Sequence, residues 1–383
     1  MTFDRVNLPL VSCQRVAGRP AGVDWRNDPM DQSLPRSGRA AILTEQRVPL
    51  VVDEVALPED LAAGQVLVRV HYSGICGSQL GEIDGVKGPD RFLPHLLGHE
   101  GSATVLATGP GVKHVTVGDL VVLHWRKGRG IEAETPTYDW RGGPVNAGWV
   151  TTFNEFAVVS ENRCTSIPLD TDRRLAALFG CAVTTGFGVV ENNARVKAGE
   201  SIVVYGSGGV GLNIVQAAAA HGASPIVGVD LYADRLELAA ELGATHLVDG
   251  SLPEVEARLR EVVGSSGTDV FVDNTGLPMV VEMGLRLTSS SGRVVMVGVP
   301  GVGERVEVAP LPLYFGKELM GSHGGEANPT VDIPRLMGLL GTDTLQLDQI
   351  VTSCFALDDV GDAIDSMRTG KVVGRCLLSI DGS

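Results

Sequence analysis

Two cysteines and one histidine of this chain have the chemistry of zinc ligands. Cys76 lies in the segment GICGS, His99 precedes Glu100 in the segment GHEG, and Cys181 follows much later. Two thiolates and one imidazole suit zinc, and three protein ligands leave a fourth position open, as in catalytic rather than structural zinc sites. Taken singly, each residue is more often a buried or hydrogen-bonded structural side chain, so the residue types alone leave both interpretations open.

A glycine-rich run provides a second chemical pattern. It follows the β-branched segment 202–205 and precedes an Ala-rich helical pattern. In such a strand–turn–helix unit the first glycine allows a tight turn, the second lets the backbone approach a pyrophosphate, and the third lets the helix pack on the strand. The helix N-terminus offers N–H donors to the phosphates. We therefore expect cofactor contacts at Gly206, Gly208, Gly209, Val210 and Gly211.

Asp230 ends the apolar run 225–229 that follows the helical pattern. An acid at this distance from the glycine run is placed to accept hydrogen bonds from the adenosine ribose of a dinucleotide. Its charge would repel a 2′-phosphate, so the sequence favours NAD over NADP.

The elements that would position these residues change character along the chain. Strand patterns come first, followed by a polar loop at 126–150, a helical pattern from Arg174 and then alternating strands and helices. The alternation is typical of a parallel, doubly wound α/β sheet. The expected strands are 39–43, 66–70, 102–107, 120–123, 202–205, 225–229, 269–273, 293–299 and 374–380, and the expected later helices are 279–287 and 358–367.

Composition and charge narrow the class of protein. The 383 residues suggest two domains, and 44% hydrophobic with 20% charged residues is typical of a soluble globular protein. Lys+Arg 31 against Asp+Glu 46 leaves a net charge of −15, which argues against nucleic-acid or anionic-membrane partners. We find no apolar run of membrane-spanning length and no secretory signal pattern, and the six scattered cysteines include no C-x-x-C pair. We expect a cytoplasmic protein.

Several segments occur together in an order that points to a known family. From about residue 39 to 383 the chain resembles the zinc-dependent alcohol dehydrogenases of the medium-chain dehydrogenase/reductase superfamily, through GICGS, GHEGSATV, VGDLVV, GCAVTTGFG, GSGGVG and VGVD. The resemblance implies an α/β fold with a GroES-like, partly β-barrel catalytic domain at 39–183 and 324–383. A Rossmann NAD-binding domain would occupy 184–323, after an N-terminal extension at 1–38.

The resemblance also implies roles for individual residues. Cys76, His99 and Cys181 match the catalytic zinc ligands, and Glu100 matches the acid behind the zinc. Ser78 matches the hydroxyl that hydrogen-bonds the substrate oxygen. The remaining matches are Trp125 as an aromatic wall of the substrate pocket, Thr185 beside the nicotinamide, Arg235 near the ribose and Arg375 near the pyrophosphate.

The chain departs from the family pattern at three places. Residues 126–150 contain no cysteine, so the lobe that binds a second, structural zinc in many relatives is missing and we expect one zinc per chain. Gln79 stands where most members have an Asp that orients the zinc-bound His, which would weaken the metal site. Gly81 replaces a proton-relay histidine, leaving water, the cofactor ribose, Glu82 or His71 as routes for the proton.

These residues predict an NAD-dependent zinc enzyme that interconverts an alcohol and its carbonyl. The cations His124, Arg126, Lys127 and Arg129, together with the small Gly81, favour a secondary alcohol of a sugar, polyol or cyclitol, with or without phosphate. Alternatively, those charges pair with nearby acids in a solvated loop. Other open alternatives are a cyclase or epimerase that retains NAD and a non-catalytic NAD sensor. We expect a homodimer or homotetramer, because the apolar strand 294–299 is followed by a short segment, 305–308, that could pair across a two-fold axis.

Overall fold

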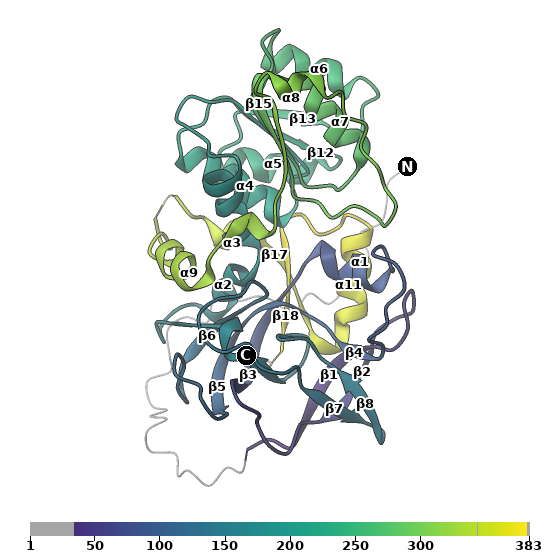
Figure 1. Ribbon diagram of the computed structural model, residues 1–383, viewed down its shortest axis with the longest axis vertical. Helices are drawn as coiled ribbons and strands as arrows, with labels where there is room; N and C mark the ends of the chain where they lie inside the picture. The colour runs from purple at the N-terminus through teal and green to yellow at the C-terminus, as the bar shows by residue number, and fades with distance from the viewer. Residues whose placement is uncertain (1–33, 343, 381–383) are drawn as a thin grey trace.

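The computed structural model describes residues 34–342 and 344–380, which form two lobes (Figure 1). Most of the expected extension 1–38 lies outside the described residues, and its last two residues already belong to a strand that begins at Ser37. One lobe contains the barrel and a mixed sheet, and the other contains a parallel sheet. The end of the chain, yellow in Figure 1, returns to the first lobe. The expected α/β fold with a partly barrel-shaped first domain is confirmed.

Five strands of the first lobe close into a barrel. Their order is β1 (Ser37–Leu43), β2 (Val51–Ala56), β7 (Thr137–Trp140), β8 (Gly143–Asn146) and β4 (His95–Leu96). The expected polar loop at 126–150 therefore contains a hairpin. On this hairpin Tyr138 and Val145 are buried inside the barrel, whereas the residues next to them are more exposed. This alternation has the two-residue period of a strand, but the surrounding charges obscure it in the sequence.

A second sheet of the same lobe brings the end of the chain beside the predicted zinc ligands. On β18, Cys376 pairs with Ile75 of β3, which directly precedes Cys76. The sheet order is β10 (Cys164–Ile167), β6 (Leu120–His124), β5 (Glu100–Thr108), β3 (Gln65–Ile75), β18 (Arg375–Ser379) and β17 (Val351–Ala356), with β9 (Phe156–Ser160) also pairing with β3.

The second lobe is a six-stranded sheet in which every neighbouring pair is parallel. Its Val-rich strands are buried on both faces by helices, as expected for a doubly wound sheet. The order is β13 (His246–Asp249), β12 (Ile226–Asp230), β11 (Ile202–Tyr205), β14 (Thr268–Asp273), β15 (Thr288–Met296) and β16 (Glu318–Gly321). This is the strand order of a Rossmann fold, with β11 leading into the glycine-rich turn.

The expectation that 305–308, after the strand at 294–299, pairs across a two-fold axis stays a prediction. β15 contains Val294 and is hydrogen-bonded to β14 on one side and to β16 on the other, so it has no free edge. Within the described residues the sheet ends at β16, and 305–308 forms no strand.

Helices cover the parallel sheet and connect the lobes. Those of the parallel lobe are α4 (Gly209–Ala220), α5 (Ala233–Glu241), α6 (Val255–Val263), α7 (Pro278–Leu287) and α8 (Leu311–Tyr314). The others are α1 (Gly77–Ile83), η1 (Glu161–Arg163), α2 (Arg173–Ala176), η2 (Ala177–Gly180), α3 (Ala182–Gly188), η3 (Val189–Asn193), η4 (Gly324–Glu326), α9 (Pro329–Met337), α10 (Leu347–Ile350), η5 (Leu357–Asp359) and α11 (Val360–Arg368).

The test for membrane-spanning helices selects no single helix among the described residues. One bent pair, 173–180 with 182–193 at 50°, passes on length and composition, and residues of both helices belong to the buried core.

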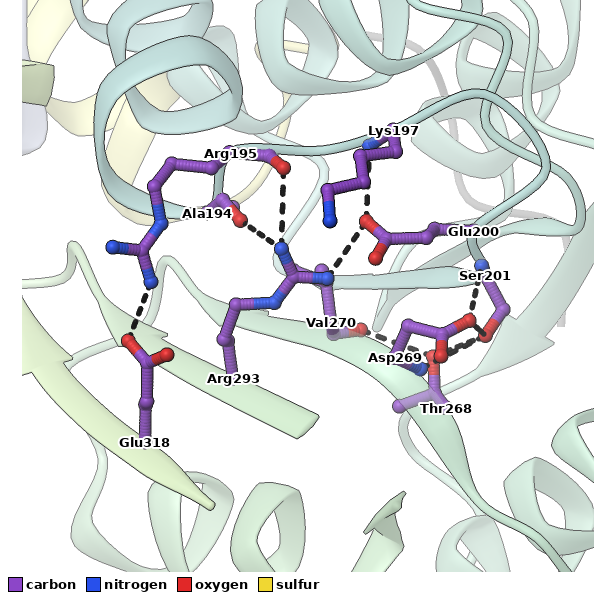
Figure 2. A network of polar contacts seen from close by, with 10 residues as sticks. All are labelled: Ala194, Arg195, Lys197, Glu200, Ser201, Thr268, Asp269, Val270, Arg293 and Glu318. Atoms are coloured by element: carbon purple, nitrogen blue, oxygen red, sulfur yellow. Dashed lines mark hydrogen bonds and ion pairs between the residues drawn. The ribbon is translucent and has the colours of Figure 1, made fainter. Parts of the chain in front are cut away.

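A buried arginine ties the connection before β11 to the parallel sheet (Figure 2). Arg293 on β15 donates from Nη1 to the carbonyl oxygens of Ala194 and Arg195 at 2.5 and 3.2 Å. Its Nη2 pairs with Glu200 Oε2 at 2.7 Å. Asp269 accepts hydrogen bonds from the backbone N–H and the hydroxyl of Ser201, both at 2.8 Å. These contacts lie at the end of the sheet opposite the glycine-rich turn.

Candidate active site

The fold brings the predicted zinc ligands together from three separate segments. Cys76 caps α1 directly after β3, His99 directly precedes β5, and Cys181 lies between η2 and α3. One ligand atom from each, together with one from Glu100, lies within 4.8 Å of all the others. Two sulfurs and one imidazole at this spacing fit a tetrahedral zinc ion with an open fourth position.

The two thiols influence each other's titration. A hydrogen bond from the Cys181 thiol, helped by His99 and Arg375, holds the pKa of Cys76 well below its usual value. The same hydrogen bond and the burial of Cys181 raise the pKa of Cys181. One thiolate therefore forms readily, and a bound metal ion would displace the second proton, which is how thiol sites normally acquire zinc.

The Gln79 amide contacts the imidazole of His99 in a way that differs from the contact a carboxylate would make. Its Oε1 accepts a hydrogen bond from the Cys76 N–H at 2.9 Å, so its amide nitrogen faces His99 Nδ1. For His99 to bind zinc through Nε2, its proton must lie on Nδ1, and the amide must then turn its oxygen toward the ring. A carboxylate has two oxygens and could accept both hydrogen bonds at once.

Glu100 and Arg375 form a fully buried ion pair between the metal site and the glycine-rich turn. The Ala182 N–H donates a further hydrogen bond to Glu100 Oε2 at 3.4 Å. Arg375 then crosses the turn so closely that a Cβ on Gly209 would lie 2.0 Å from Arg375 Cδ. Its Nε has no hydrogen-bond partner in the described structure and belongs to a side chain that lines the main cavity.

That cavity, about 680 Å³, joins the two chemical patterns of the sequence. Cys76 and Ser78 line one end, and the other end is lined by the glycine-rich turn, Asp230 and Arg235. The Ser78 hydroxyl is buried and has no hydrogen-bond partner among the described residues.

The glycine-rich turn has the geometry that a pyrophosphate requires. Gly206 has φ 98°, a left-handed value, and a Cβ on Gly211 would lie 2.0 Å from the Gly206 carbonyl oxygen. An added Cβ on Gly208 meets no protein atom within 4 Å, so its surface faces open space. Val210 also lines the cavity, at the start of α4.

Asp230 is held where β12 ends. Its Oδ2 accepts a hydrogen bond from the Ser207 N–H at 2.8 Å, and its Oδ1 lies 3.7 Å from Arg235 Nη1. Arg235 itself donates two hydrogen bonds to the Val372 carbonyl, at 3.2 and 2.9 Å.

Trp125 and Thr185 lie beside Cys181, and hydrogen bonds from both side chains partly oppose the rise in its pKa. Trp125 also packs edge-on against His99 and His323, at centroid distances of 6.5 and 4.8 Å. Sequence reasoning missed His323, whose position no local pattern signals. It also missed Asn274, a cavity-lining residue with both amide atoms unpartnered. Asn274 directly follows β14, and the carboxyl ends of parallel strands are where such residues are expected.

The cations after β6 are largely occupied by contacts within the protein. His124 is buried, Lys127 lies 3.7 Å from Glu132, and Arg126 donates to the carbonyls of His323 and Ala327 at 2.6 and 3.3 Å. Of the two interpretations of these cations, binding of a polar substrate or pairing within the protein, the contacts therefore favour pairing within the protein for most of them.

The two proposed relay side chains lie away from the cavity. His71 is buried on β3, with Nε2 2.8 Å from the Thr104 hydroxyl. Glu82 is not among the residues that line the main cavity, whereas Gly81 is.

A Rossmann sheet joined to a barrel lobe, with two cysteines and a histidine where they meet, defines a zinc-dependent dehydrogenase. Family models agree: "Alcohol dehydrogenase GroES-like domain" matches residues 62–169 and "Zinc-binding dehydrogenase" matches 209–341. The chain is 30% identical to an S-(hydroxymethyl)glutathione dehydrogenase of Synechocystis, covering 88% of this chain and 98% of that one. A second such enzyme, from Paracoccus denitrificans, is 28% identical, with 89% and 99% covered.

Solved structures give the same result. An alcohol dehydrogenase zinc-binding domain protein from Burkholderia ambifaria matches with a TM-score of 0.81 and 29% identity, covering 90% of this chain and 99% of that one. Benzyl alcohol dehydrogenase from Acinetobacter calcoaceticus matches with 0.80 and 27%, covering 90% and 100%. The chain belongs to the zinc-dependent alcohol dehydrogenases of the medium-chain dehydrogenase/reductase superfamily and is an oxidoreductase that uses zinc and a nicotinamide cofactor.

Proposed function

We propose that this enzyme interconverts an alcohol and its carbonyl at one zinc held by Cys76, His99 and Cys181, with NAD as the hydride carrier. The observation that carries the proposal is the cavity that continues from Cys76 and Ser78 to the glycine-rich turn. Zinc would supply the positive charge that favours an alkoxide, and the nicotinamide would accept the hydride.

The residues around the cavity would then position the substrate and move its proton. Ser78 has an unpartnered hydroxyl and would accept the proton of the alcohol. Because Gly81 offers no titratable group and His71 packs elsewhere, we propose that water in the cavity carries the proton onward. Glu100, neutralised by Arg375, would support the metal site from behind.

A matched pair of cysteine variants tests the metal site. Cys181→Ala should lose zinc and activity while NADH still binds, because the glycine-rich turn belongs to the other lobe. Cys164→Ala, which replaces a buried cysteine outside the ligand set, should keep one zinc per chain and its activity. Equal zinc content and turnover in the two variants would remove the basis for the proposal, as would two tightly held zinc ions per wild-type chain.

The preference for NAD is supported by the surroundings of Asp230. Its carboxylate would accept ribose hydrogen bonds and repel a 2′-phosphate, and Arg235 is turned toward the Val372 carbonyl. Asp230→Asn should weaken NADH binding about tenfold, the loss of one hydrogen bond to a charged group, while NADP binding improves or stays unchanged. A wild-type enzyme that prefers NADP would contradict the assignment.

For the substrate we propose a secondary alcohol of a sugar, polyol or cyclitol. Support comes from Gly81, which lines the cavity and presents no side chain there, so it leaves the space that a relay histidine would occupy. The cations at 126–129 give less support than the sequence suggested. Rates for polyols, cyclitols, phosphorylated polyols and simple alcohols should favour the polyhydroxylated compounds, and Gly81→Val should reduce those rates selectively. Ethanol or benzyl alcohol as the best substrate would refute this choice.

We also propose a homo-oligomer, dimer or tetramer. Leu311, Tyr314 and Phe315 around α8 are 65, 84 and 73% exposed, and neighbouring exposed apolar side chains of this kind often mark a protein–protein contact.

A further inference from the structure

Glu82, Asp90 and His95 form a second group of metal-ligating side chains, separate from the cysteine site. One ligand atom from each lies within 4.8 Å of the other two. His95 Nε2 is 2.9 Å from Asp90 Oδ2 and 3.9 Å from Glu82 Oε1. The three residues come from the last turn of α1, from the segment before β4 and from β4 itself.

The orientation of His95 matches that of a metal ligand. Its ring is buried, and Nδ1 lies 2.9 Å from the Leu96 carbonyl oxygen, which can only accept a hydrogen bond. The proton on Nδ1 is therefore fixed, and in the neutral ring the Nε2 lone pair points at two carboxylates. A ligating histidine typically donates its other N–H to a carbonyl or carboxylate in this way.

The charges around Glu82 favour a cation. Its carboxylate makes no hydrogen bond to any residue that the structure describes, and its one ion-pair contact there is the 3.9 Å approach to His95. Burial raises the pKa of Glu82 and Asp90 adds to the rise, while His95, His99 and Lys87 oppose it. Two carboxylates thus share one imidazole, and a divalent cation would balance them.

We propose that Glu82, Asp90 and His95 form a second, weaker divalent-cation site that zinc occupies through one imidazole nitrogen and two carboxylate oxygens. Such a mixed set of nitrogen and oxygen ligands is one that zinc accepts, with water completing the tetrahedron. The site would join the end of α1 to β4. Because α1 follows Cys76 and β4 leads to His99, an ion there would stiffen the segments that carry two catalytic ligands. The proposal does not depend on the substrate or on the choice of NAD.

Zinc titration of the full chain tests the site. Protein carrying one zinc per chain is dialysed against increasing zinc chloride, and bound zinc and melting temperature are measured. The wild type should take up a second equivalent and melt at a higher temperature. Glu82→Gln should retain the first zinc and lose both responses. This substitution is isosteric and breaks no hydrogen bond of the described structure, so the variant should fold.

Two further measurements distinguish this site from other zinc binding. Glu59→Gln, which changes an exposed acid of the same lobe, should behave like the wild type. With cobalt chloride, the second equivalent should add d–d absorbance without a thiolate charge-transfer band, because the site contains no sulfur. The proposal is overturned if Glu82→Gln binds as much zinc as the wild type, or if the wild type binds only one equivalent. The cluster would then be an ion pair only.

Discussion

His124 is a buried residue whose two ring nitrogens both have partners. Nδ1 lies 2.7 Å from the Arg126 carbonyl oxygen and Nε2 lies 2.9 Å from the Thr165 hydroxyl. Both contacts suit a neutral ring that donates from Nδ1 and accepts at Nε2. Burial lowers the pKa of His124 to about 4, and the neighbouring Arg163 adds to the effect.

The free energy of unfolding should therefore fall in acid through this residue. In the unfolded chain the His124 ring takes up a proton near pH 6.5, whereas in the folded chain the ring stays neutral down to about pH 4. The contribution is complete above the unfolded pKa and is lost as the pH falls through this window, up to about 3 kcal/mol. Urea unfolding at pH 7 and pH 4.5 should show a smaller pH dependence in His124→Asn than in the wild type. His246→Asn, which changes an exposed histidine, should retain the wild-type dependence.

At the scale of the strand–turn–helix unit, substitutions at two glycines should distinguish an effect on cofactor binding from an effect on folding. Gly208→Ala adds a methyl group that meets no protein atom within 4 Å, so the melting temperature should stay unchanged while NADH binding weakens by more than tenfold. Gly211→Ala forces a Cβ to 2.0 Å from the Gly206 carbonyl and should lower the melting temperature. Thermal unfolding without cofactor and fluorescence titration with NADH measure the two effects. Unchanged NADH affinity in Gly208→Ala would refute the assignment of this turn.

The arginines of Figure 2 give a second matched pair at this scale. Arg293→Met removes a guanidinium that is 10% exposed, which leaves Glu200 without its countercharge and two carbonyls without this donor, and should cost about 3 kcal/mol of unfolding free energy. Arg195→Met removes an ion pair to Glu318 whose side chains are 55 and 45% exposed. It should cost less than about 1 kcal/mol. Denaturant unfolding compares the two variants, and equal losses would contradict the assigned role of Arg293.

At the scale of the whole molecule, the apolar surface around α8 predicts self-association. Light scattering at micromolar concentration should give at least a dimer for the wild type. Tyr314→Asp combined with Phe315→Asp should shift it toward the monomer because two charges would be buried. Leu169→Asp, at a residue 62% exposed on the other lobe, should leave the mass unchanged. A monomeric wild type would contradict the prediction.

The sequence predicts the parallel lobe well because that lobe is encoded locally, whereas the zinc-ligand set lies on three separate segments and was indicated only by the resemblance to a known family. Buried valine runs, the glycine turn and the acid at Asp230 follow one another within a single unit. The hairpin at 137–146 was hidden because only alternate residues face the barrel. The partners of Arg126 come from residues 323–327, far along the chain, so the sequence could not reveal that this cation is occupied. The group formed by Glu82, Asp90 and His95 was hidden for a different reason: its members are close in the sequence but follow no regular helix or strand spacing.

The position of Arg375 has a consequence for synthesis. Ribosomes make chains from the N-terminus, and Arg375 lies on the last strand, whereas its partner Glu100 is completely buried in a strand made much earlier. Until the end of the chain leaves the ribosome, Glu100 lacks its countercharge, and an unpaired buried carboxylate is costly. The first lobe therefore cannot reach its final packing until β18 has been made. The arginine that crosses the cofactor turn arrives with the same strand, so the region between the metal site and the dinucleotide site is completed by that strand.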